Sequence, residues 1–178
     1  MALKATIFKT DLQISDMDRN HYRDYALTIA RHPSETDRRM MVRILAFALH
    51  AQEDLAFTRG LSTDDEPDLW GKSLSDEVLL WVDLGQPDEK RIRKACGRAR
   101  EVWIYTYNDR SARVWFEQLG GKLERFDNLR IIHLPETSII QLAALAQRNM
   151  QLQCSIQDGA IWLGDLEQSI QVEPESWK

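Results

Sequence analysis

The amino-acid sequence predicts an α/β protein in which a mixed β-sheet is flanked by helices, within a single domain over residues 1–178. From residue 34 onward, the expected elements follow the order α-β-β-β-α-β-α-β-α, which indicates a sheet with helices on both faces. Residues 78–84 (VLLWVDL) are apolar on both faces, as in a central strand covered by helices. Residues 34–52 and 88–99 each carry an apolar stripe at helical spacing.

The composition favours a globular protein without a global affinity for nucleic acid. The chain has 43% hydrophobic residues, a net charge of −5 and a pI near 5.4, so nucleic-acid binding would depend on a local basic patch. No run approaches the roughly 18 apolar residues of a membrane span, and the first residues show no signal-peptide pattern. We therefore expect a soluble cytoplasmic protein with no membrane partner. Cys96 and Cys154 lack CxxC spacing and are expected to be reduced core residues.

The first thirty residues are expected to form a long hairpin. Apolar and polar residues alternate over residues 2–14 and again over 22–30, and the polar turn between them contains Asp16 and Asp18, which we interpret as solvated. A helix then follows over residues 34–52. Ser34 is its expected N-cap, with Asp37 in the capping-box position.

Short strands and helices alternate through the rest of the chain. We expect strands over residues 55–61, 68–73, 78–84, 101–108 and 129–134, and helices over residues 88–99, 111–118 and 136–148. Residues 151–156 and 160–163 flank Asp158-Gly159, a strong signal for a hairpin turn. The last residues, QVEPESWK, are expected either to pair as an edge strand or to fray.

Acidic side chains and a basic helix flank meet between residues 64 and 94. Asp68 opens one strand and Asp83 ends the next, while Arg91, Lys94 and Arg98 share one flank of the following helix. Carboxylates from neighbouring strand ends are ligands that Mg²⁺ prefers, and a bound metal could activate water for phosphodiester cleavage. A solvated acidic loop explains the same residues without a metal, so both interpretations stay open at this point.

Other catalytic patterns are absent from the sequence. The four histidines show neither HxH nor HExxH spacing, and there is no GxSxG elbow, GxGxxG loop or GxxxxGK[ST] loop. Trp81, Trp103 and Trp162 fall within expected strands and are interpreted as core residues. Trp70 lies beside Asp68 and would be placed to stack on a nucleic-acid base.

Long motifs along nearly the whole chain resemble the bacterial YaeQ family. They are MALKATI at residues 1–7, RHPSET at 31–36, FTRGLSTDDEP at 57–67, GQPDEKRIRKAC at 85–96, TYN at 106–108 and SIQDGAIWL at 155–163. The resemblance implies a fold similar to the PD-(D/E)XK nuclease core, the restriction-endonuclease-like αβββαβ unit, with a β-hairpin added at each end. That core would run from the helix at residues 34–52 to the strand at 101–108.

The resemblance also implies a set of site residues. Glu35, Asp68 and Asp83 match the three acidic positions of the superfamily, which would bind Mg²⁺ or Mn²⁺. The lysine expected two residues after the second strand acid is missing, because position 85 is glycine. Lys94 is the candidate replacement from the following helix, and Arg91 would clamp a phosphate oxygen.

Two functions follow from the resemblance. The first is a metal-dependent nuclease or phosphodiesterase in which Lys94 stabilises the attacking water or the phosphate. The alternative is a non-catalytic module on a degenerate nuclease fold that binds nucleic acid or a protein and acts in regulation. On residues alone, the first turn of a helix also favours a carboxylate at Glu35 without any catalytic role.

Overall fold

The computed structural model describes residues 4–59 and 65–178, which form two compact units. The first unit contains the chain up to Ala48 together with Pro135–Pro174, and the second contains Leu49–Leu134 with Glu175–Lys178. Each unit contains one mixed β-sheet and its own helices. The predicted mixed α/β fold is therefore confirmed, although the structure has two mixed sheets where the sequence predicted one. The single domain over residues 1–178 stays a prediction.

The first unit is organised on a five-stranded sheet in the order β10-β9-β8-β1-β2. Its strands are β1 (Thr6–Asp16), β2 (His21–Arg31), β8 (Asn149–Gln157), β9 (Ala160–Gly164) and β10 (Ser169–Val172). The two predicted hairpins, β1–β2 and β8–β9, are confirmed. They are joined by parallel pairing of β1 with β8, which places Lys9 opposite Asn149. The predicted start of the first strand at residues 2–3 lies outside the described residues.

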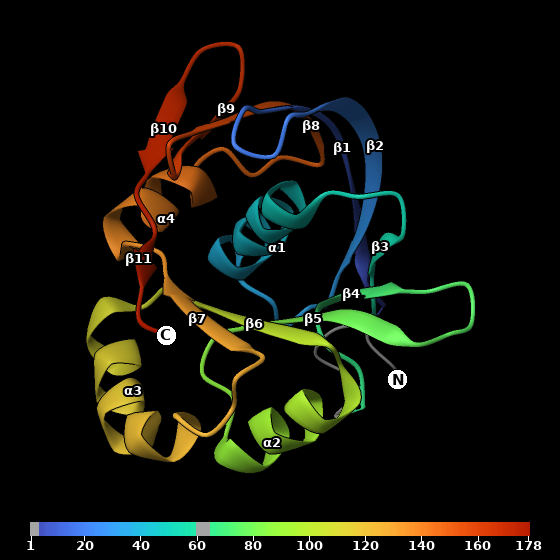
Figure 1. The fold of residues 1–178 in the computed structure, drawn as a ribbon. Coiled ribbons are helices and arrows are strands. Elements are labelled where there is room, and N and C mark those ends of the chain that lie inside the picture. The colour runs from blue at the N-terminus through green and yellow to red at the C-terminus, as the bar shows by residue number, and fades with distance from the viewer. Residues whose placement is uncertain (1–3, 60–64) are drawn as a thin grey trace. The chain divides into compact units, whose positions relative to one another are not determined.

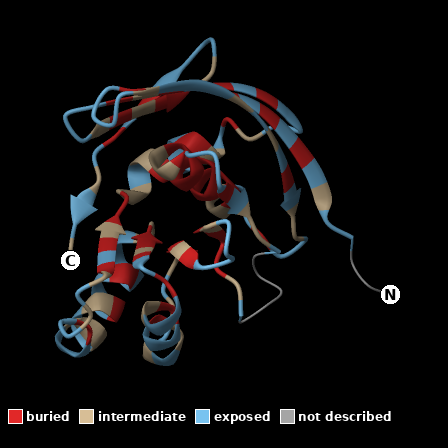
Figure 2. Cartoon of the chain, turned by 45° about the vertical axis from the view of Figure 1, so that its right-hand side comes forward, coloured by how far each residue is buried: buried red, intermediate tan, exposed pale blue. Residues whose placement is uncertain are grey.

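Helix α1 (Asp37–His50) lies inside the curve of this sheet, and α4 (Glu136–Ala143) lies beside β10 (Figure 1). Alternating side chains of β1 are buried, including Phe8, Leu12 and Ile14, because successive residues of a strand point to opposite faces. Every residue from Met40 to Ala48 is buried, which makes α1 a core helix (Figure 2).

Helix α1 begins later than the sequence predicted. The backbone N–H of Arg39 donates to Thr36 Oγ1 at 3.1 Å, so Thr36 and not Ser34 caps the first turn. The Ser34 hydroxyl instead pairs with His32 Nδ1 at 2.6 Å. The His32-Pro33 pair keeps the preceding residues extended, because the residue before a proline disfavours helical geometry.

The second unit is organised on a six-stranded sheet in the order β11-β7-β6-β5-β4-β3. Its strands are β3 (Leu55–Phe57), β4 (Leu69–Lys72), β5 (Val78–Leu84), β6 (Glu101–Thr106), β7 (Leu129–His133) and β11 (Glu175–Ser176). Strands β5, β6 and β7 are parallel, and the crossovers between them contain α2 (Glu89–Arg98) and α3 (Asp109–Leu123). Both helices lie on the same face of the sheet (Figure 1). The predicted end of the first of these strands, at residues 60–61, lies outside the described residues.

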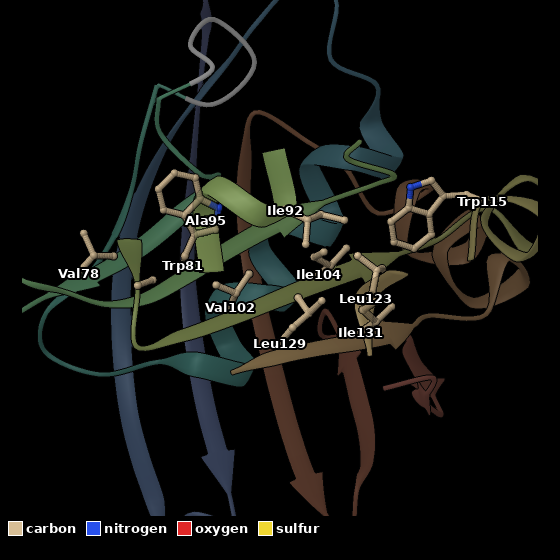
Figure 3. Packing of buried hydrophobic residues seen from close by; sticks show 11 residues of the cluster. Val78, Trp81, Ile92, Ala95, Val102, Ile104, Trp115, Leu123, Leu129 and Ile131 are labelled. Carbon is tan, nitrogen blue, oxygen red and sulfur yellow. The ribbon is translucent and has the colours of Figure 1, made fainter. Parts of the chain in front are cut away.

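The core of the second unit packs α2 and α3 against this sheet (Figure 3). Apolar side chains from strands and helices form one buried cluster, which consists of Val78, Trp81, Ile92, Ala95, Ala99, Val102, Ile104, Trp115, Leu123, Leu129 and Ile131. Leu123 explains why α3 continues across Gly120-Gly121, five residues beyond the predicted end at Gln118, since its fully buried side chain anchors the last turn. This packing fixes the position of α2 relative to β5.

The second hairpin turn and the tail agree with the sequence, whereas Asp16 in the first turn is not solvated as expected: it is 2% exposed and its Oδ2 lies 2.7 Å from Arg19 Nε. Asp158 and Gly159 have φ values of 51° and 79°, as a type I′ hairpin turn requires. The tail pairs and does not fray, since β10 joins β9 and β11 joins β7. No helix in residues 4–59 and 65–178 is long and apolar enough to cross a lipid bilayer.

Both cysteines are free thiols in the structure. Cys154 is buried in the first unit, and Cys96 is partly buried against the core of the second. Burial raises the pKa of the Cys96 thiol to about 11 and that of the Cys154 thiol to about 12. The thiolate forms are therefore scarce at neutral pH, which agrees with a packing role for both residues.

Candidate functional site

Two buried carboxylates lie side by side in the second unit where β4 begins and β5 ends. The antiparallel register places Leu69 opposite Val82, so Asp68 and Asp83 are neighbours, and the Asp68 N–H donates to the Val82 carbonyl at 2.9 Å. Asp68 Oδ2 accepts the N–H of Leu84 at 2.9 Å. Their exposed fractions are only 4% and 2%. We call Asp68 and Asp83 the carboxylate pair.

Burial dominates the electrostatics of Asp83. Desolvation raises the pKa of its carboxyl group above the usual value, and the nearby charge of Asp68 raises it further. Hydrogen bonds and charge from Arg91, with the indole of Trp81, oppose the increase without cancelling it. The fold therefore holds Asp83 where ionisation is costly even with the Arg91 guanidinium beside it.

The raised pKa of Asp83 makes a prediction about stability in the absence of divalent cations. Because the folded pKa lies above the unfolded value near 3.8, the stability contributed by this group is present below pH 3.8 and is lost as the pH rises through the folded value. Relative to Asp83→Asn, the wild-type free energy of unfolding should fall from pH 3.8 toward neutrality. Urea unfolding of both proteins across this range measures the difference. A difference that stays constant with pH would contradict the raised pKa.

Three cations on one side of α2 face this region, and we call Arg91, Lys94 and Arg98 the basic flank. Arg91 binds Asp83 through two bonds, Nε to Oδ2 at 3.0 Å and Nη2 to Oδ1 at 2.9 Å. Lys94 forms an ion pair with Asp65, and Arg98 Nη1 donates to the Asp65 carbonyl at 2.7 Å. This contact with Lys94 lowers the pKa of the Asp65 carboxyl group.

Two indoles lie beside the carboxylate pair, on the same face of the sheet. Trp70 and Trp81 are opposite each other in the β4–β5 register, with ring centroids 6.4 Å apart in an edge-on arrangement. Lys72 Nζ lies 3.9 Å from the centre of the Trp70 ring, and the Arg98 guanidinium lies 5.3 Å from that of Trp81. The Trp70 ring is partly exposed and forms a cation–π contact with Lys72.

Glu35 belongs to the first unit and is held by two arginines. Its Oε1 lies 3.1 Å from Arg39 Nη1, and its Oε2 lies 2.6 Å from Arg43 Nη2. The side chains of Glu35 and Arg43 are almost completely buried, and Arg43 Nη2 also donates to the Ala30 carbonyl at 3.2 Å. This cluster ties the segment before α1 to β2 and to the helix itself.

The structure brings Asp68, Asp83 and Arg91 together in the second unit, with Trp70 on the same face of the sheet, and their roles toward a metal, a phosphate or a base stay predictions. Lys94 contacts Asp65, so its predicted role toward a water or phosphate stays a prediction, as does the metal-binding role of Glu35. In residues 4–59 and 65–178, no three His, Cys, Asp or Glu side chains are grouped closely enough to hold a metal ion.

Two features of this site were missed from the sequence. Trp81 precedes Asp83 by two residues in one strand. Side chains two residues apart in a strand point to the same face, so the sequence could have predicted that both lie on one face of the sheet. Asp65 lies in a turn without periodicity, and no local pattern signalled its contact with Lys94.

A second polar network lies at the carboxyl ends of β6 and β7. His133 Nδ1 pairs with Thr106 Oγ1 at 2.7 Å, and His133 Nε2 pairs with Asp109 Oδ1 at 2.7 Å. The Trp177 ring stacks on His133 at a centroid distance of 4.6 Å. Thr106 has no exposed surface, so its hydroxyl cannot reach a substrate, and we interpret the network as structural.

The sequence of the chain matches a family of known proteins. The family model described as YaeQ protein matches residues 1–174. The uncharacterised proteins YaeQ of Salmonella typhi and of Escherichia coli K12 are each 47% identical over 178 residues, covering 100% of this chain and 98% of theirs.

Two solved structures share the fold. The crystal structure of YaeQ protein from Xanthomonas axonopodis pv. citri is 46% identical, with a TM-score of 0.95 and 98% of each chain covered. The crystal structure of YaeQ protein from Pseudomonas syringae is 37% identical, with a TM-score of 0.94, covering 98% of this chain and 96% of the other. The whole described fold therefore has experimental counterparts.

Proposed function

This chain belongs to the YaeQ family, and from its carboxylate pair we propose that it is a metal-dependent phosphodiesterase that cleaves nucleic acid. The observation that carries this proposal is the burial of Asp68 and Asp83 side by side at two neighbouring strand ends. Two acidic groups are seldom brought together away from water unless a cation neutralises them. This placement also agrees with a nuclease core of the restriction-endonuclease type.

The residues of the site fit a hard divalent cation. Mg²⁺ is commonly bound by one or two protein carboxylates, with waters and phosphate oxygens completing its coordination, and Asp68 with Asp83 supply such a set. The buried indole N–H of Trp81, which has no hydrogen bond of normal geometry, lies close enough to Asp83 to favour its ionised form. Bound Mg²⁺ or Mn²⁺ would supply an activated water and neutralise phosphate charge.

The chain's own groups orient the substrate. Arg91 has the planar guanidinium that binds a phosphate through two parallel bonds. Lys94, whose side chain is about half exposed, would leave Asp65 to stabilise the attacking water or the developing charge on the phosphate. Trp70 offers a ring face for a base. The metal-ligand role of Glu35 is only what the family resemblance implies, and its carboxylate is bound by Arg39 and Arg43.

Cleavage of labelled oligonucleotides tests the proposal. Single- and double-stranded DNA and RNA are incubated with the protein in Mg²⁺, in Mn²⁺ or in EDTA. We expect cleavage only with metal, and a decrease of about 100-fold or more in Asp68→Asn because one carboxylate ligand is lost.

The matched control is Asp76→Asn, an exposed aspartate in the β4–β5 hairpin. Asparagine tolerates the positive φ of that position, so this variant should cleave as the wild type does. The proposal is wrong if no substrate is cut with metal, or if Asp68→Asn and Asp76→Asn cut equally well.

A second candidate function is a non-catalytic module that binds nucleic acid or a protein in regulation. The observation that favours it is that Arg91 already neutralises Asp83, while Gly85 stands where the superfamily lysine would be. Such a module would bind oligonucleotides in EDTA, tolerate Asp68→Asn and lose affinity in Arg98→Gln. Fluorescence anisotropy with the same labelled oligonucleotides distinguishes the two functions.

A further inference from the structure

We infer that Arg91 is an internal counter-ion of Asp83, and that a divalent cation binds the carboxylate pair by displacing the Arg91 guanidinium. This inference rests on the proposed function, because it concerns how the same site admits its metal. It assigns to Arg91 two successive partners, first Asp83 and then a phosphate group of the substrate.

The geometry of the ion pair carries the first step. One guanidinium spans both oxygens of Asp83, at 3.0 and 2.9 Å, and its Nη2 also donates to the Glu66 carbonyl at 2.8 Å. The Asp83 side chain is 3% exposed, so water hardly reaches its oxygens, whereas Arg91 is 25% exposed. A cation that approaches Asp83 therefore competes with Arg91 for the carboxylate, and not with bulk water.

The indole of Trp81 supplies a second, independent observation. Trp81 is 1% exposed, it shares one face of β5 with Asp83, and its Nε1 has no hydrogen-bond partner of normal geometry. A buried donor without a partner costs free energy. While Asp83 is paired with Arg91, one buried polar group near it stays unsatisfied, so the ion pair does not complete the hydrogen bonding of this part of the site.

The displaced guanidinium remains close to the site. Arg91 lies in the first turns of α2, which is fixed on the sheet through the buried Ile92 and Ala95. The side chain can leave Asp83 without movement of the helix, because only its terminal bonds must rotate. A phosphate held at the metal would then offer the same two-oxygen acceptor that Asp83 gave up.

Competition sets the size of the expected effect. A hydrogen bond to a charged group contributes about 1.5–3 kcal/mol, which corresponds to roughly 10- to 100-fold in a dissociation constant. Removing Arg91 should therefore tighten metal binding by roughly 10- to 100-fold. A simple phosphate clamp without this competition would leave metal affinity unchanged.

Calorimetric titration of Mn²⁺ into the full chain tests the inference. Arg91→Gln should bind Mn²⁺ roughly 10- to 100-fold more tightly than the wild type, and Arg91→Lys, which keeps the charge but loses the two-bond geometry, should lie between them. The matched control is Arg93→Gln, which removes the same charge from an exposed position of α2 and should change little. Asp83→Asn should abolish binding.

The outcomes separate this inference from the proposed function. Binding that is lost in Asp83→Asn but equal or weaker in Arg91→Gln would overturn the role of Arg91 while the metal site stands. If neither the wild type nor either Arg91 variant binds Mn²⁺, the metal site and the inference both fail. If Arg91→Gln does not fold, Arg91→Lys decides, since affinity at or below the wild-type value contradicts displacement.

Discussion

Asp83→Asn is expected to reduce metal-dependent cleavage by about 1,000-fold while the fold stays intact. A metal ion contributes several kcal/mol to charge stabilisation at a phosphoryl oxygen, and each 1.4 kcal/mol is worth a factor of about ten in rate. The amide is nearly isosteric with the carboxylate but is a weaker ligand that carries no charge. Arg91 keeps its contact with the Glu66 carbonyl and its access to water, so the loss of its partner should be tolerated.

Initial cleavage rates, with circular dichroism as the check on folding, measure this effect. Asp88→Asn is the matched control, because Asp88 caps α2 through the Arg91 N–H and asparagine caps a helix equally well. The control should cleave within about twofold of the wild type. Cleavage by Asp83→Asn at the wild-type rate would contradict a catalytic role for the carboxylate pair.

Glu35→Gln is expected to lower the free energy of unfolding by about 3–5 kcal/mol, the usual cost of breaking a buried ion pair from one side. The reason is the almost completely buried Arg43 guanidinium, which would lose the carboxylate 2.6 Å away. Arg39 would lose its contact with the same carboxylate. Urea unfolding measures the change.

The control for Glu35 is Glu136→Gln in the same unit. Glu136 pairs with Arg38 at 3.3 Å, and both side chains are at least one-third exposed, so this variant should lose at most about 1 kcal/mol. A small loss of stability in Glu35→Gln, combined with weaker Mn²⁺ binding, would contradict the structural role and favour the ligand role that the family resemblance implies.

Local patterns were sufficient to predict most elements of the second unit. The continuous apolar run at residues 78–84 and the apolar stripe of α2 predicted the bounds of β5 and α2 to within a residue or two. Both patterns follow directly from which side chains are buried. The end of α3 was missed, since Gly120-Gly121 is a weak helix sequence that the buried Leu123 overrides.

Only the two carboxylates of the candidate site could be placed from the sequence, because they lie at neighbouring strand ends. Asp68 and Asp83 could be placed together because one opens a strand and the other closes its neighbour. The cation that binds Asp83 comes from another element, α2. The periodicity of the sequence does not predict which long basic side chain of that helix reaches the carboxylate. For Glu35, the arginines four and eight residues later were visible as helical spacing, but their burial was not.

The parallel pairing of β1 with β8 bears on how the protein is made. During synthesis, β1 leaves the ribosome about 140 residues before β8. The β1–β2 hairpin therefore lacks its neighbour strand, β8, during most of synthesis. The second unit waits as well, because β11 follows β10 in the chain. Both units are therefore completed only when the last strands emerge, and the nascent chain exposes an unpaired edge of β1 until β8 has been made.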